Sequence, residues 1–530
     1  MKRSFTLQKQ TKSQRKPIWQ ALLPFILPKI GDSVWIGIFL FVSQMGQKMM
    51  NADGDLGRHL TIGSFILTSG QVPTSDVFSH TMAGHILTPH EWLSQTIFAL
   101  FYRWWGFPGI TLVNGIVIAT TFWLVYKTAR ANSGSLSAAL LTTVLAVFAS
   151  LLHWLSRPHL FTFLLMALWM HELEALRANY NSKKISDTRW WTFPLMMVLW
   201  ANLHGAFIAG FVTFALYGAG FFLDTLLNRS DPDGQTSPGK SFWSAYAAAG
   251  VVSLLVTILN PSGIKLWETS VGYLGSNFLV DMTVEYRSPN FHDLSAQPFL
   301  LLIGMTALLF GMQRRKIIGT HVIVTTAWMV MALYSARNIP LFAILSAPIL
   351  ASLIGDWFKI AAQRGKGLHG LWKLDQGLLK LEHSLRGIFY PLLALLWAFY
   401  LLSSGLNTPA RSAITYNSDR FPVAAVDWLV EHPQSGNMFN EFTWGGYLLY
   451  RLWPEQLVFI DGQTDFYGEA LTREYLQVKD VDAGWENVLD KYQVGWVIIP
   501  SSAHLASELR ELPGWEPIYE DSTAQIFRRE

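Results

Sequence analysis

The chain of 530 residues contains no cysteine, and charged residues make up only 15% of it. The lack of cysteine excludes disulfides, Cys-ligated zinc and thiol catalysis. An ordinary soluble protein carries about 25% charged residues, so the low charge argues against a soluble enzyme. Nucleic acid is not an expected partner, because no groove-forming pattern of basic and aromatic residues occurs.

Apolar residues are abundant instead, at 51% of the chain, with 34 Phe and 23 Trp. A bilayer crossing needs about 20 apolar residues. We expect eleven membrane spans, at 34–51, 108–126, 137–154, 158–173, 190–203, 206–226, 242–259, 297–312, 317–334, 338–356 and 387–404. The apolar segment 17–31 is too short to span and is predicted to be an interfacial helix.

The distribution of Lys and Arg sets the expected orientation. With the N-terminus inside, the inner segments carry 24 Lys and Arg, whereas the outer side up to residue 386 carries seven. Cytoplasmic loops are enriched in these residues. The sequence therefore predicts a cytoplasmic region 1–33, a transmembrane domain 34–404 with an external loop 52–107, and an external domain 405–530.

Polar side chains concentrate in the outer turns of the predicted topology. Ionisable groups at membrane depth usually serve a function, so we expect an active or binding site at the outer face. The candidates are Asp53, Asp55, His59, Glu91, Arg157, His204, Glu285, Arg287 and Arg337. Structural roles are the alternative for each of them: helix capping for the aspartates, headgroup or ion pairing for the arginines and glutamates, and ordinary hydrogen bonding for the histidines.

The external loop 52–107 and the domain 405–530 have different patterns. The loop is predicted to hold two helices that lie along the membrane surface, the first starting near Asp55. The domain alternates helices and strands, which predicts an α/β fold. Short buried strands are expected at NMFNEF, LVFID and YQVGWVIIPSS, and a hairpin at the end of the chain. Asp461 and Asp465 follow an expected strand end, either as turn residues or as acceptor-side ligands.

Several motifs resemble a large group of bacterial membrane proteins related to the GT-C glycosyltransferases. These are DGDLGRHLTIGSFILTSG, HEWLSQTIFALFYRWWG, SRPHLFTFLL, WANLHGAFIAG, ARNIPLFAI, NEFTWGGYLLYR and VFIDGQTDFYG. The resemblance implies an all-α polytopic GT-C-like bundle of about 11 transmembrane helices with a C-terminal external α/β domain. It also implies a location in the bacterial inner membrane.

The resemblance further implies transfer of a hexosyl or pentosyl group from a polyprenyl-phosphate sugar to an external acceptor, which is a protein, a lipid or a glycan. Asp53 or Asp55 would be the acidic residue of the loop that takes part in catalysis. Related mannosyl- and aminoarabinose transferases have Asp-Glu here, and this chain has Asp-Gly-Asp. Oligosaccharyltransferases carry Trp-Trp-Asp, which is only loosely echoed around Trp444, so transfer to an Asn sequon is not expected.

The chemistry of such a transfer assigns roles to the candidates. Asp53 or Asp55 would take the proton of the acceptor hydroxyl, and Arg157, Arg287 or Arg337 would hold the phosphate. A divalent metal, Mg²⁺ or Mn²⁺, on Asp53 and Asp55 is a second interpretation, and no other cofactor is expected. Membrane lipids are expected to surround the spans. A transporter, flippase or binding protein for lipid-linked glycans is the alternative function, although no paired halves are visible.

Overall fold

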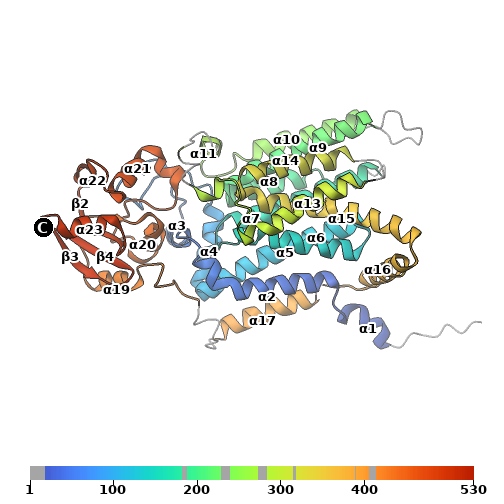
Figure 1. Ribbon diagram of the computed structural model, residues 1–530, viewed down its shortest axis with the longest axis horizontal. Coiled ribbons are helices and arrows are strands. Elements are labelled where there is room, and N and C mark those ends of the chain that lie inside the picture. The colour runs from blue at the N-terminus through green and yellow to red at the C-terminus, as the bar shows by residue number, and fades with distance from the viewer. Residues whose placement is uncertain are drawn as a thin grey trace, which may run out of the picture.

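The computed structural model describes residues 18–181, 188–227, 239–272, 278, 283–313, 318–387, 389–404 and 414–530. The basic segment 1–16, predicted to be a cytoplasmic anchor, lies outside these residues. So do parts of the predicted inner loops, at 182–187, 228–238 and 314–317. The described chain forms a helical bundle with a small sheet-containing domain at one end (Figure 1).

The bundle contains a helix for each of the eleven predicted spans. They are α2 (Ile30–Met50), α5 (Phe107–Ser133), α6 (Leu136–Ser150), α7 (His159–Asn181), α8 (Thr192–Leu203), α9 (Ile208–Leu227), α10 (Lys240–Val256), α13 (Gln297–Gly311), α14 (Gly319–Tyr334), α15 (Ile339–Arg364) and α17 (Phe389–Ser403). Six helical stretches of the described chain are long and apolar enough to cross a membrane, and a bent pair adds a seventh. The chain is therefore a multi-pass membrane protein of the predicted all-α class with a C-terminal α/β domain.

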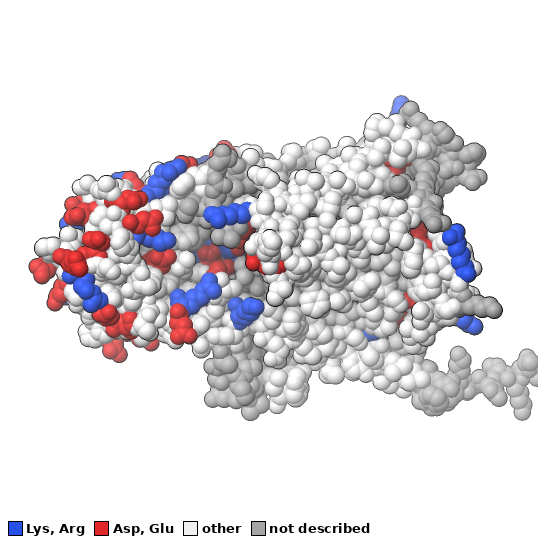
Figure 2. Space-filling model, in the orientation of Figure 1, with Lys and Arg blue, Asp and Glu red and all other residues white. Residues whose placement is uncertain are grey.

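Helices α5 and α15 form the centre of the bundle. In each, 83% of the apolar window is buried, compared with 22% for the peripheral window at 294–311. Proline in the first turn starts both helices, and Gly134 with a φ of 56° ends α5. The outer helices present leucine and phenylalanine to the surroundings, and Figure 2 shows that this surface carries almost no charge. Charged side chains gather instead on the small domain.

A helix that was not predicted from the sequence closes the end of the bundle opposite the small domain. Helix α16 (Lys366–Ser384) lies in a segment that we expected to be an inner loop, and a short helix, α1 (Ile18–Ile26), precedes α2. The Asp375 carboxylate accepts from the N–H and hydroxyl of Ser137, and Glu382 accepts from the N–H groups of Ile30 and Gly31. These carboxylates satisfy the open N–H groups at the starts of α6 and α2.

The external loop contains the two predicted helices, α3 (Asp55–Ser69) and α4 (Trp92–Trp105), but α3 does not lie on an open membrane surface. It is buried between α4 and α20 (Gly445–Leu452) of the external domain. Glycines permit the close contact, since a Cβ on Gly57 would overlap the Gly446 carbonyl oxygen. The apolar residues of α3 therefore pack against protein, where the sequence analysis expected lipid.

The external domain has a four-stranded sheet in the order β1-β2-β4-β3. The strands are β1 (Asn437–Asn440), β2 (Val494–Pro500), β3 (Trp515–Glu520) and β4 (Ala524–Arg529), with β1 parallel to β2 and the other pairs antiparallel. The surrounding helices are α19 (Val423–Glu431), α20, α21 (Thr464–Lys479), α22 (Trp485–Lys491) and α23 (His504–Glu511). The terminal hairpin is thus confirmed.

One predicted strand of the domain is wrong. The segment LVFID does not join the four-stranded sheet. Val458 makes an isolated parallel bridge to Ser79 of the external loop instead. The Val458 N–H donates to the Phe78 carbonyl, and the His80 N–H donates to the Val458 carbonyl. The segment is therefore extended and buried as expected, but its partner is the loop 52–107. This pairing ties the loop to the domain directly above the bundle.

Candidate functional site at the outer end of the bundle

Three carboxylates converge on Arg157, which lies in the turn before α7. Its guanidinium forms an ion pair with Asp55, and Nη1 lies 3.5 Å from Asp53 Oδ2 and 3.1 Å from Glu285 Oε1. Asp53 ends the segment after α2, Asp55 begins α3, and Glu285 lies in a short 3-10 helix, η5 (Val284–Tyr286). Four predicted site residues from four separate segments are thus brought together. The attraction of the carboxylates raises the pKa of Arg157, which keeps the guanidinium charged.

The two aspartates have different surroundings. Asp53 Oδ1 accepts a hydrogen bond of 3.0 Å from the Asp55 N–H at the start of α3. Asp53 therefore caps this helix, which was the alternative role expected for the aspartates. Asp53 Oδ2 has no hydrogen-bond partner among the described residues. Burial raises the pKa of Asp53 to about 6, against a lowering effect of Arg157. Asp55 is instead held by Arg157 and packs against Gly462 of the external domain.

Arg337 lies beside this cluster in η7 (Ala336–Asn338). It donates a hydrogen bond of 2.6 Å to the Tyr286 hydroxyl and lies over the Tyr286 ring. Among the described residues, no carboxylate is within ion-pair distance of Arg337. Arg287 differs: its side chain is exposed, and its carbonyl accepts from the Ala336 N–H. Its backbone therefore joins the two 3-10 helices.

Glu91 is the centre of a second group of predicted residues. Its carboxylate lies 3.6 Å from His204 Nε2, 3.8 Å from His59 Nδ1 and 3.9 Å from Arg58 Nη2. His90 Nε2 is also 3.9 Å away. Burial, with help from Arg58, holds the pKa of His59 well below its usual range, so this imidazole is neutral. The predicted proximity of His59, Glu91 and His204 is thus present.

Arg58 connects the loop helix α3 to the external domain. It donates a hydrogen bond of 2.8 Å to Gln463 Oε1, and its Nε lies 3.8 Å from Asp461 Oδ1. Burial raises the pKa of Asp461 to about 6, although Arg58 opposes this. Asp465 lies 4.0 Å from His90 Nδ1. Asp461 and Asp465, predicted on the acceptor side, therefore face the loop.

Trp444 is placed elsewhere. It is buried in the core of the external domain, and its indole N–H donates to the Arg420 carbonyl. The side chain packs with the α20 residues and is not directed at the carboxylate cluster. Trp444 is therefore a core residue of the external domain.

A divalent metal does not match the geometry around Asp53 and Asp55. The Arg157 guanidinium occupies the position between these carboxylates and Glu285, where a shared metal ion would have to lie. No group of three or more metal-ligating side chains with suitable spacing is found among the described residues. The second interpretation from the sequence, a metal on Asp53 and Asp55, would need the arginine displaced.

The sequence analysis missed several residues of the site. Arg58 entered the prediction only as one of the positive charges on the outer side, although Asp55, Arg58 and His59 are spaced to share one face of a helix. Gln95 and Tyr286 carry no charge and gave no signal. Gln463 follows the same expected strand end as Asp461 and Asp465, either as a turn residue or as a ligand-binding residue, but its partner was not predicted. Its partner Arg58 lies 405 positions away in the sequence, a distance that no local pattern bridges.

Comparison with known proteins identifies the fold. No known family matches the sequence, and no curated protein is similar to it. Among solved structures, the Archaeoglobus fulgidus oligosaccharyltransferase, tethered to an acceptor peptide with the NVT sequon, aligns with a TM-score of 0.54 and 11% identity. The alignment covers 88% of this chain and 69% of that one. The same archaeal enzyme, AglB, in complex with an inhibitory peptide and a dolichol-phosphate, gives a TM-score of 0.52, 11% identity and the same coverage.

A further structure, ArnT from Cupriavidus metallidurans bound to undecaprenyl phosphate, covers 93% of this chain and 97% of its own. Its TM-score is 0.49 and its identity 15%. At these identities the likeness establishes the fold. The chain is a membrane protein with a GT-C-like fold, similar in architecture to an archaeal oligosaccharyltransferase.

Proposed function

We propose that this protein transfers a sugar from a polyprenyl-phosphate donor to an acceptor at the external face of the membrane. The observation that carries the proposal is the Arg157 cluster, which places Asp53, Asp55 and Glu285 at one end of an apolar bundle, beneath a polar domain. A similarly folded structure, of AglB, contains a dolichol-phosphate, which supports a lipid-phosphate donor. The predicted orientation, with this end outside, belongs to the proposal.

Asp53 is the base in this proposal. A base works best with a pKa near the working pH, and burial raises the pKa of Asp53 to about 6. Its Oδ2 makes no hydrogen bond among the described residues, so its lone pairs remain to accept the proton of a hydroxyl. Asp55 is a positioning residue, because its ion pair with Arg157 fixes the guanidinium beside Asp53.

Arg337 holds the leaving phosphate. Arginine matches phosphate oxygens with its fork of N–H donors. Arg157 is already paired with carboxylates, whereas the Arg337 guanidinium has the Tyr286 hydroxyl as its hydrogen-bond partner. Arg337 therefore keeps N–H groups for a phosphate, and the Tyr286 ring beneath it fixes its direction.

The step balances without a further reactant. The acceptor hydroxyl gives its proton to Asp53 Oδ2 while its oxygen forms a bond to the sugar C1. The bond from C1 to the phosphate oxygen breaks, and both of its electrons leave with the polyprenyl phosphate at Arg337. No part of this step is routed through a metal, since the Arg157 guanidinium lies between the carboxylates.

Binding of undecaprenyl phosphate to the purified protein in lipid nanodiscs tests the proposal. We expect Arg337→Gln to weaken binding at least about tenfold, since a charge-assisted hydrogen bond contributes roughly 1.5–3 kcal/mol. Arg103→Gln is the matched control, because Arg103 is exposed on α4. Equal affinities of wild type and Arg337→Gln would refute this role of Arg337. Failure of the wild-type protein to bind would refute the donor class.

A further inference from the structure

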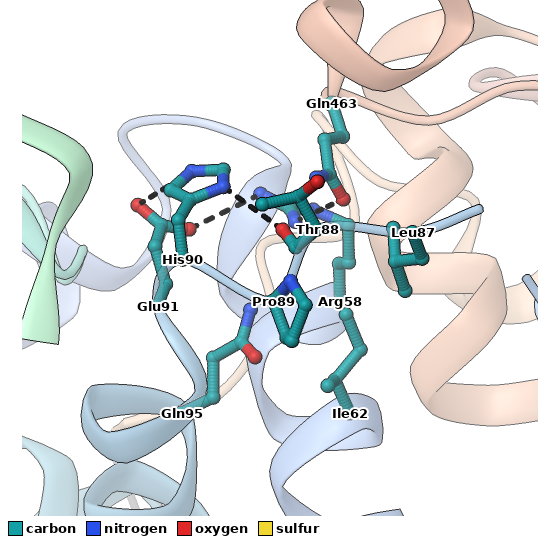
Figure 3. Close-up of a pocket in the computed structure, with 9 residues that line it drawn as sticks. All are labelled: Arg58, Ile62, Leu87, Thr88, Pro89, His90, Glu91, Gln95 and Gln463. Atoms are coloured by element: carbon teal, nitrogen blue, oxygen red, sulfur yellow. Dashed lines mark hydrogen bonds and ion pairs between the residues drawn. The ribbon is translucent and has the colours of Figure 1, made fainter. Parts of the chain in front are cut away.

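A pocket lies beside the carboxylate cluster, at the junction of three segments. Helix α3, the approach to α4 and the loop after Ile460 of the external domain all contribute walls (Figure 3). Its volume is about 230 Å³, including the open mouth. The lining residues are Arg58, Ile62, Leu87, Thr88, Pro89, His90, Glu91, Gln95 and Gln463. Asp55 precedes Arg58 by three positions on α3, so the pocket adjoins the Arg157 cluster.

The pocket walls hold polar atoms without hydrogen-bond partners among the described residues. Gln95 is only 3% exposed, and its Oε1 accepts no hydrogen bond. Arg58 Nε is likewise buried and makes no hydrogen bond within the described chain, although Asp461 Oδ1 lies 3.8 Å away. The four nitrogens around Glu91 stay 3.6–3.9 Å from its oxygens, too far for a hydrogen bond. Buried polar groups without hydrogen bonds are unfavourable, so a ligand that pairs with them is stabilised.

The charge of the pocket disfavours an anion. Arg58 is already paired with Gln463, Asp461 and Glu91. Asp465 adds another carboxylate at the mouth, 4.0 Å from His90. Acids therefore outnumber the single arginine, and a phosphate would meet net repulsion. A neutral ligand that both donates and accepts hydrogen bonds suits these walls better.

The pocket also has an apolar side. Ile62 is 4% exposed and Leu87 also 4%, and Pro89 lies between them and Gln95 (Figure 3). Polar groups on one side and aliphatic groups on the other match a sugar ring, which presents hydroxyls at its edge and C–H groups on its face.

We propose that this pocket binds an uncharged sugar ring, whose hydroxyls donate to Glu91 and to Gln95 Oε1 and accept from Arg58 Nε. The ring rests partly in the mouth, since the enclosed part is small. This inference uses the proposed function only for the source of the ring, because both the donor and the acceptor of a glycosyl transfer carry sugars. The binding itself is independent of any turnover.

Saturation-transfer NMR with methyl β-glucoside, methyl β-galactoside and methyl α-mannoside tests the pocket. The protein is used as full chain in lipid nanodiscs, because glycosidic detergents would compete. We expect signal from at least one glycoside with the wild type, and loss of that signal in both Gln95→Leu and His90→Phe. Gln71→Leu, on an exposed part of the same loop, is the matched control and keeps the signal. Unchanged melting temperatures show that the variants are folded.

Competition identifies the source of the ring. If undecaprenyl-phosphate glucose displaces the glycoside and undecaprenyl phosphate does not, the ring is the donor's. If neither displaces it, the ring is the acceptor's. Displacement by undecaprenyl phosphate, which carries no sugar, would mean that the pocket binds the phosphate and would overturn the proposal. So would absence of any glycoside signal, or equal signals from wild type, Gln95→Leu and His90→Phe. Failure of the proposed function appears separately, as loss of lipid-phosphate binding.

Discussion

At the scale of single residues, the site depends on carboxylates that have little contact with water and that lie next to arginines. Asp461 is buried and Asp53 is half-buried, and the loss of water around each carboxylate raises the pKa of each to about 6. Arg157 and Arg58 lie beside them and supply opposing charge. Near neutral pH these groups therefore stand close to their titration range, which is where proton transfer is efficient.

Asp461 should make the stability of the protein depend on pH. Its pKa is higher in the folded than in the unfolded chain, so the folded state binds the proton more tightly. The stabilising effect is present at low pH and is lost as pH rises through about 6. We expect the wild type to gain about 0.8 kcal/mol relative to Asp461→Asn between pH 7.5 and 5.5, because only part of the titration falls in this range.

Thermal unfolding of both proteins across this pH range measures the difference. Asp419→Asn, at an exposed position, is the control and should follow the wild type. Parallel curves for wild type and Asp461→Asn would show that Asp461 does not titrate in this range.

At the scale of elements, the site is assembled by the packing of α3 against α20. Gly57 and Gly446 allow the two backbones to touch, and Gly462 lies against the Asp55 carboxylate. The contact fixes Asp55, Arg58 and the pocket walls relative to the external domain. Loop and domain therefore form one unit above the bundle.

A methyl group in this contact should be harmful. We expect Gly57→Ala to lower the free energy of unfolding by about 1–3 kcal/mol, the usual cost of overpacking. In a helix without such a contact, Gly→Ala gains about 0.5–1 kcal/mol. Gly304→Ala in α13, where a Cβ has open space, should show that gain. Thermal melting of the two variants checks the opposite signs, and a stabilised Gly57→Ala would disprove the close contact.

The elements also show what the sequence could and could not predict. The apolar runs predicted the helices of the bundle, because hydrocarbon thickness dictates their composition. The same signal placed α3 on lipid, since an apolar face looks alike whether protein or lipid covers it. The segment around Val458 was predicted to be a strand of the domain because its residues are apolar. Its bridge partner is Ser79, far away in the sequence. Helix α16 was missed because its apolar and charged residues alternate within a short segment.

At the scale of the whole molecule, charged side chains are dense on the small domain, sparse along the side of the bundle, and present again in small number at the opposite end (Figure 2). The polar candidates predicted from the outer turns do meet at the junction of the domain and the bundle, since topology alone brings the outer turns together. Their pairing was not predictable, because Glu285 and Arg157 are 128 positions apart. A transporter would place its polar groups midway through the membrane, and this arrangement at one end favours chemistry at a surface.

Release of undecaprenyl phosphate from a panel of undecaprenyl-phosphate hexoses and pentoses tests the central claim most directly. The purified protein is supplied with a bacterial envelope extract as acceptor, and the product is measured by mass spectrometry. We predict release from at least one donor and a loss of about 100-fold or more in Asp53→Asn, with Asp419→Asn unaffected. No release from any donor, or a wild-type rate in Asp53→Asn, would contradict the account.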